Sequence, residues 1–197
     1  MIIKNGNIIL KQEMKSFIKN FVLYLNSKIS NKAVTIIDTS GNSREVNFGT
    51  FRHKFYTRYE WVNLEIQEQC DAPENDITYG ILVGSGTAPV SPDDYTLSEL
   101  IGSDKLSYGS CLTSQVTVEN NVIKFTYARP IVNMSSDVVT INETGIVMKI
   151  KRFITSDNRV RYSEEFYMLI ARDVLDTSIS LNPNEGANVI YTIKVSV

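Results

Sequence analysis

Short apolar runs dominate the hydrophobic pattern beyond residue 30. They are rich in Val, Ile, Thr, Tyr and Phe, and clusters of Gly, Asn, Asp, Ser and Pro separate them at the spacing typical of antiparallel β proteins. So many strands without intervening helices indicate a sandwich or a barrel. We predict a mainly β fold, an antiparallel, jelly-roll-like β-sandwich. The predicted strands are Ala33–Asp38, Phe55–Gln69, Thr78–Gly84, Gln115–Val118, Asn121–Ala128, Val138–Ile141, Gly145–Phe153, Glu165–Asp173 and Val189–Val197.

The apolar residues at the beginning of the chain recur with a different period. From Leu10 to Leu25, apolar residues recur at steps of three and four, which predicts an N-terminal amphipathic α-helix. Its apolar stripe could pack on the chain's own sheet or against a neighbouring subunit, and the sequence leaves both open. We therefore divide the chain into an N-terminal strand and helix segment, residues 1–30, and a single β-sandwich domain, residues 31–197.

Two turns are predicted from their residue types. Glu119–Asn121 joins two alternating runs, and asparagine tolerates the positive φ of a tight hairpin. Asn182–Gly186 introduces the last strand, where the residues from Val189 to Val195 at every second position are apolar.

Charge and composition limit the partners. The 197 residues carry 20 Lys and Arg against 22 Asp and Glu, a net charge of -2, so we expect no direct nucleic-acid readout. No stretch approaches the roughly 20 apolar residues of a membrane-spanning helix, and Met1–Leu10 does not have the form of a signal peptide, so we expect a soluble protein without membrane contact. Cys70 and Cys111 are expected to be free, buried thiols.

Motifs for catalysis or cofactor binding are weak. His53 is the single histidine, and there is no GxSxG elbow. Gly84–Pro89 begins like a dinucleotide fingerprint, but Pro89 occupies the third glycine position and no βαβ unit surrounds it. We expect no catalytic residue and no cofactor.

The carboxylates of Ser91–Tyr95 have two interpretations. They could gather around calcium, or they could cap a short helix over Tyr95–Ile101, which we favour. We therefore expect no metal.

An aromatic group has two interpretations as well. Core packing is favoured, but a platform for carbohydrate is the basis of the alternative function, a carbohydrate- or receptor-binding β-sandwich module of a fibre. The group consists of Phe51, Phe55, Tyr56, Tyr59 and Trp61.

Four segments carry a resemblance. In Tyr79–Leu97 (YGILVGSGTAPVSPDDYTL), a strand ends in a Gly-x-Gly-Thr turn that leads to a Pro-Asp-Tyr-x-Leu loop. It is followed by Val139–Ile146 (VTINETGI), Leu169–Leu175 (LIARDVL) and Val189–Val195 (VIYTIKV). In content and order these segments, within residues 76–197, resemble small structural virion proteins of tailed bacteriophages.

This resemblance implies a structural, non-enzymatic part of the tail, neck or collar. The protein would form a homo-oligomer, expected to be a ring, and would contact other tail, neck and portal proteins of the virion. It would be soluble in the host cytoplasm before assembly. The long loop after the Thr78–Gly84 strand is our candidate subunit interface, because long ordered loops usually have a functional role. Its candidate residues are Gly84, Gly86, Thr87, Pro89, Pro92, Asp93, Asp94 and Tyr95.

Overall fold

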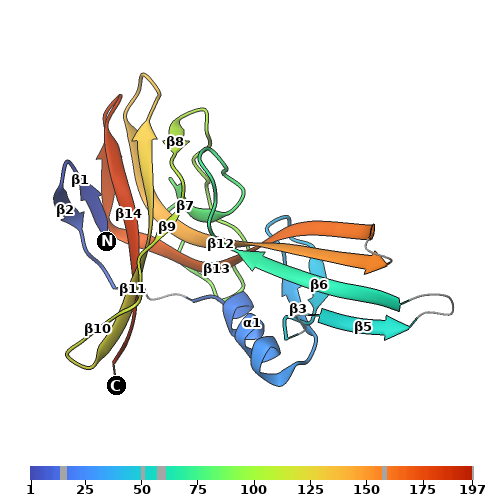
Figure 1. Ribbon diagram of the computed structural model, residues 1–197. Coiled ribbons are helices and arrows are strands. Elements are labelled where there is room, and N and C mark those ends of the chain that lie inside the picture. The colour runs from blue at the N-terminus through green and yellow to red at the C-terminus, as the bar shows by residue number, and fades with distance from the viewer. Residues whose placement is uncertain (14–16, 50–51, 57–60, 157–158, 197) are drawn as a thin grey trace.

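A computed structural model describes the backbone of residues 1–13, 17–49, 52–56, 61–156 and 159–196. Side chains are described for residues 1–13, 17–49, 66–153 and 163–195. The protein is mainly β, and its strand pairs are antiparallel, as predicted. Two larger sheets and a small two-stranded sheet contain the strands (Figure 1).

The first sheet has seven strands in the order β10-β11-β14-β1-β2, and β8 and β9 also pair with β11. The long pair β11·β14 is in register from Val122↔Ser196 to Val132↔Gly186. The bounds of the strands are Ile2–Lys4 (β1), Asn7–Leu10 (β2), Leu106–Tyr108 (β8), Leu112–Thr113 (β9), Thr117–Glu119 (β10), Val122–Asn133 (β11) and Gly186–Ser196 (β14).

The second sheet has five strands in the order β13-β12-β6-β5, and β7 also pairs with β12. The far ends of β12 and β13 extend with β5 and β6 away from the first sheet as an arm (Figure 1). Register shifts after Ile141, Ile146 and Ile154 show that β12·β13 is a bulged ribbon. The bounds are Arg52–Tyr56 (β5), Trp61–Gln69 (β6), Gly80–Gly84 (β7), Val139–Ser156 (β12) and Arg159–Leu181 (β13).

The core contains the inward-facing residues of both sheets. Every residue of β7 is buried, as expected of a strand covered on both faces. Burying an aliphatic side chain stabilises a fold by about 1.5–3 kcal/mol, so this core is the main source of stability. Its most deeply buried members include Val83, Leu106, Tyr108, Ile131, Ile141, Leu169 and Leu181.

The prediction of a helix over Leu10–Leu25 is wrong in position. Leu10 ends strand β2, and the helix of the described residues, α1, is Lys19–Ser30. The physical reason lies in the pairing of the residues before it: Phe17 bridges to Ala171, and the N–H of Ile18 donates to the carbonyl of Ile170 at 3.2 Å. The chain is therefore extended along β13 at residues 17 and 18, and the helix begins only afterwards.

Helix α1 ends at a left-handed asparagine. Asn31 has φ 52°, and its N–H donates to the carbonyl of Ser27 at 2.9 Å. Buried Asn20 donates to the carbonyls of Ile37 and Leu169 at 2.9 and 3.3 Å. These bonds tie α1 to β13 and to the small sheet, formed by β3 (Val34–Ile37) and β4 (Ser43–Val46).

Both predicted turns are confirmed. Asn120 and Asn121 have φ of 50° and 61° and connect β10 to β11, as in a type I′ hairpin. Asn184 has φ 62° in the turn that precedes β14. Each predicted strand overlaps a strand of the structure, but Phe55–Gln69, predicted as one strand, is divided between the end of β5 and β6, which pair with each other. The strands that overlap the predictions are β3, β5, β6, β7, β10, β11, β12, β13 and β14.

Candidate functional site

The loop after β7 leaves the second sheet at Gly84 and returns to it at Leu100. A bridge joins these two residues, and the N–H of Ser85 donates to the carbonyl of Glu99 at 2.8 Å. The N–H of Ile101 donates to the carbonyl of Val83 at 3.0 Å. Main-chain pairing therefore closes the base of the loop.

A buried ion pair lies beneath this loop. Glu143 of β12 and Arg172 of β13 have side chains that are 0% and 2% exposed, and Arg172 Nε donates to Glu143 Oε2 at 2.7 Å. The Glu143 carboxylate also accepts the N–H groups of Ser98 and Glu99 at 3.1 and 2.8 Å. A buried carboxylate needs such partners, because its desolvation is costly. Glu143 thus fixes the returning part of the loop to the sheet.

Arg172 fixes the outgoing part. Its Nη1 donates to Asp94 Oδ2 at 2.7 Å, and its Nη2 donates to the carbonyl of Ala88 at 2.9 Å. Burial acts to lower the pKa of Arg172, but the hydrogen bonds with Asp94 and Glu143 outweigh it and raise the pKa above its usual value. The guanidinium therefore remains charged. We call Glu143, Arg172 and Asp94 the loop anchor.

The two glycines of the loop make room for this anchor. A Cβ built on Gly84 would lie 2.5 Å from Glu143 Oε1 and 2.5 Å from the carbonyl oxygen of Glu99. A Cβ on Gly86 would lie 2.6 Å from Glu143 Oε1. Glycine at these two positions therefore allows the Glu143 carboxylate to lie close to the main chain of the loop. Neither glycine has a positive φ.

We expect Gly84→Ala to destabilise the protein by about 1–3 kcal/mol, because the new methyl group overlaps a main-chain oxygen and a fully buried carboxylate. Gly102→Ala is the matched control, because its Cβ would meet the carboxylate end of exposed Asp104, which can move aside. Urea unfolding of both variants measures the difference. Equal losses would show that the space at Gly84 is not restricted.

The remaining candidate residues of the loop lie on its outer side. Thr87, Pro89, Pro92, Asp93 and Tyr95 are exposed. Two contacts join this part to α1: Lys19 Nζ pairs with Asp93 Oδ1 at 2.9 Å, and the N–H of Lys19 donates to the carbonyl of Pro92 at 3.0 Å. The structure thus brings the candidate residues into one ordered loop, with Asp94, Gly84 and Gly86 on its inner side.

The predicted short helix over Tyr95–Ile101 is wrong. The N–H groups of Ser98 and Glu99, which a helix would direct to carbonyls one turn back, donate to the side chain of Glu143. Asp94 does not cap a helix either. It accepts the N–H of Ser91 at 2.9 Å and binds Arg172, so that residues 91–94 form a turn.

A second buried arginine, Arg129 of β11, is 0% exposed. Its guanidinium lies over the ring of Tyr108, 4.9 Å from the centroid. Five hydrogen bonds of 2.5–3.1 Å match its five N–H donors and connect it to main-chain carbonyls of three segments. The acceptors are Pro73, Asp76, Tyr79, Ile81 and Gly109.

Sequence reasoning missed Arg129, Glu143 and Arg172. The alternation of side chains along a strand could have located Arg129, because the residues two positions before and after it, Tyr127 and Ile131, are both buried. A charge at an inward position of a strand indicates a buried polar network.

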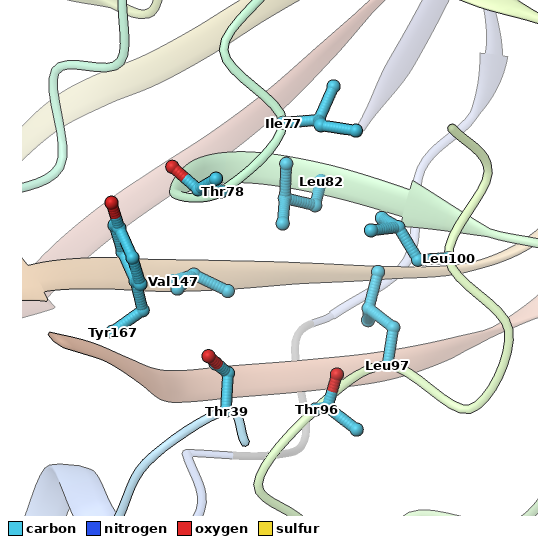
Figure 2. A pocket seen from close by; sticks show the side chains of 9 residues that line it. All are labelled: Thr39, Ile77, Thr78, Leu82, Thr96, Leu97, Leu100, Val147 and Tyr167. Carbon is cyan, nitrogen blue, oxygen red and sulfur yellow. The ribbon is translucent and has the colours of Figure 1, made fainter. Parts of the chain in front are cut away.

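A pocket of about 240 Å³ lies between the loop and the second sheet (Figure 2). Its volume is below the roughly 300–1,000 Å³ of typical small-molecule sites. Among the described lining residues, the Tyr167 phenol is the sole titratable group, so they include no pair for acid-base chemistry. The lining consists of Thr39, Ile77, Thr78, Leu82, Thr96, Leu97, Leu100, Val147 and Tyr167.

The cysteines have the properties of structural residues. Both are free, and Cys111 is buried. Burial raises the pKa of the Cys70 thiol to about 12, so at neutral pH it is protonated and a poor nucleophile. The side chains of the predicted aromatic group from Phe51 to Trp61, and that of His53, lie outside the described residues.

Among the described residues, some of the exposed apolar side chains form two groups. The first, which we call the tip, continues the inward face of the first sheet beyond buried Tyr127 and Tyr191. Its outermost row crosses three strands as Val118↔Ile123↔Val195, and these side chains are 70%, 39% and 58% exposed. Phe125↔Ile193 forms the partly buried row between them and the core. The tip therefore has the apolar side chains typical of a core face, but these side chains are exposed.

The second surface, the helix stripe, lies on α1. Val22, Leu25 and Ile29 are 61%, 41% and 85% exposed, and their spacing places them on one side of the helix. The opposite side, with Asn20 and Ser27, is buried.

Within the described part of the chain, no helix is both long and apolar enough to cross a membrane. Three or more His, Cys, Asp or Glu side chains grouped to hold a metal ion do not occur among the described residues. Comparisons with protein-family models, curated proteins and solved structures gave no match for this chain.

Proposed function

We propose that this chain is a structural subunit of a tailed-bacteriophage virion, a component of the tail or neck that assembles into a ring and contacts neighbouring tail and portal proteins. The single observation that carries the assembly part is the tip. Three aliphatic side chains on neighbouring strands form an exposed row. Because side chains alternate between the two faces of a strand, this row lies on the same face as buried Tyr127 and Tyr191. Such patches mark interaction surfaces in folded proteins.

The loop anchor supports the same proposal. A subunit of a large assembly needs loops of fixed shape, and two buried charged side chains hold the loop from Gly84 to Leu100 at both ends. The resemblance of Tyr79–Leu97 to virion proteins supplies the virion part. In this proposal, the seven- and five-stranded sheets are the halves of a jelly-roll-like sandwich.

The test is the mass of the purified protein by light scattering across a concentration series, with negative-stain images of the same samples. We expect a defined oligomer and ring-shaped particles. A monomer at every concentration, together with glycan binding on an array, would contradict the proposal and favour the carbohydrate- or receptor-binding alternative.

A further inference from the structure

The turn between β1 and β2 contains the one Asn-Gly pair of the chain. Lys4 pairs with Asn7, so the loop consists of Asn5 and Gly6, with φ of 51° and 77°. We propose that Asn5 is a site of spontaneous covalent modification: its side-chain amide is lost through a cyclic imide, and the isoaspartate that forms opens the β1–β2 hairpin. This inference does not depend on the proposed function.

The reaction needs water as its only co-reactant. The main-chain nitrogen of Gly6 gives up its proton and forms a bond to Cγ of Asn5, the bond from Cγ to Nδ2 breaks, and ammonia leaves with that proton. Water then opens the five-membered imide. Cleavage between the Asn5 carbonyl carbon and the Gly6 nitrogen leaves the chain linked through Cγ, which is isoaspartate, whereas cleavage between Cγ and that nitrogen gives aspartate. Either product has OH in place of the NH₂ of asparagine.

The structure leaves the turn open to this reaction. Asn5, Gly6 and Asn7 are exposed, so water reaches the turn. Gly6 has no Cβ that would obstruct the approach of its nitrogen to Cγ of Asn5. A Cβ built on Gly6 would meet no atom within 4 Å beyond its chain neighbours, so packing does not restrict the turn either.

Ring closure requires the main chain of Asn5 to leave its turn conformation, and the place of the hairpin in the sheet allows this. In the described part of the chain, β2 is an edge strand of the first sheet (Figure 1). Its residues Asn7, Ile8 and Ile9 are exposed, and strands with few buried contacts open locally at a low free energy. After β2, Gln12 donates to the carbonyl of Val174 at 3.0 Å, so the opening is confined to the hairpin.

Isoaspartate would disrupt the pairing of β2. It adds a methylene carbon to the main chain of the turn, and a two-residue hairpin loop tolerates little change in its geometry. The pair Lys4↔Asn7 should therefore be lost. Strand β1 keeps its pairing with β14 at Ile2↔Val189, and Ile2 is 2% exposed. The modification should loosen β2 while the rest of the sheet persists.

Other asparagines of the same chain provide the comparison. Among the described residues, six asparagines have a positive φ, so their main chains occupy the same region as that of Asn5. The other five precede residues with a side chain, which hinders ring closure. They are Asn31, Asn75, Asn120, Asn121 and Asn184, followed by Lys32, Asp76, Asn121, Val122 and Glu185.

The test incubates the full-length protein in mildly alkaline buffer and follows each asparagine by mass spectrometry of its peptides. Fragmentation distinguishes Asn5 from Asn7 and isoaspartate from aspartate. We expect conversion at Asn5 to be at least about tenfold faster than at the other five asparagines. In the modified protein the amides of residues 7–10 should exchange several-fold faster with solvent, while that of Ile190, which donates to Met1, stays unchanged.

Asn5→Gly is the control variant, because Gly-Gly also forms this kind of turn but has no side-chain amide to lose. After the same incubation, its exchange at residues 7–10 should equal that of the fresh variant. Conversion at Asn5 no faster than at Asn31 or Asn184 would overturn the proposed site. Isoaspartate at Asn5 with unchanged exchange at residues 7–10 would overturn its effect on the hairpin.

Discussion

Replacing Arg129 by methionine should cost about 3–5 kcal/mol of the free energy of unfolding, because five main-chain carbonyls in the interior lose their donor at once. Methionine keeps the unbranched apolar stem of arginine but is shorter and has no N–H donor in its side chain, so the loss also includes the space that the guanidinium filled. Arg129→Lys should give an intermediate loss, since three N–H donors on one nitrogen cannot reach acceptors in three segments.

Arg152→Met is the control for this experiment. Arg152 has a side chain that is 31% exposed and pairs with partly buried Glu164, which also pairs with Arg44. After Arg152→Met the carboxylate therefore keeps a cation, and we expect a smaller loss than for Arg129→Met. Urea unfolding followed by fluorescence measures all three variants. A loss for Arg129→Met no larger than that for Arg152→Met would show that the carbonyl network contributes little.

Removing either partner of the loop anchor should be nearly as costly. Arg172→Met leaves the fully buried carboxylate of Glu143 without its cation, and Glu143→Leu leaves the Ser98 and Glu99 N–H groups and part of Arg172 unsatisfied. Each should lose about 3–5 kcal/mol. The double variant should lose less than the sum of the two, by about 0.5–3 kcal/mol, because no buried charge is then left alone.

Hydrogen exchange reports the local effect of the same variants. In Arg172→Met and Glu143→Leu, the amide of Glu99, which donates to Glu143 in the wild type, should exchange faster than in the wild-type protein. The exchange of the Ile190 amide, which donates to Met1 in the first sheet, should increase less. Strictly additive losses and unchanged exchange at Glu99 would contradict the role of the anchor.

Local sequence signals predicted much of the fold. The strands that alternate regularly, such as β11 and β14, and the asparagine turns before them were predicted because their signals lie within a few residues. The turn Asn5-Gly6, with φ of 51° and 77°, carries the same kind of signal and joins β1 to β2. We predicted a strand within residues 1–30 but not this hairpin. Val138–Ile141 and Gly145–Phe153 were predicted as two strands but form the single strand β12, because a bulge near Asn142 continues the ribbon past polar residues.

The loop anchor could not be predicted from local signals. Arg172 is 29 residues from Glu143 and 78 from Asp94, so their meeting depends on the pairing of β12 with β13 and on the path of the loop. The pattern around Asp94 indicated a helix cap, and long-range hydrogen bonds overrode it. Similarly, the apolar stripe was predicted over Leu10–Leu25, but the helix starts at Lys19 because Phe17 and Ile18 pair with β13.

A cryo-electron-microscopy reconstruction of the assembled protein tests the central claim most directly. We expect a ring in which the tip of each copy is buried in the contact between copies, with the anchored loop unchanged in shape. Monomeric particles alone, or an oligomer that leaves the tip in solvent, would contradict it.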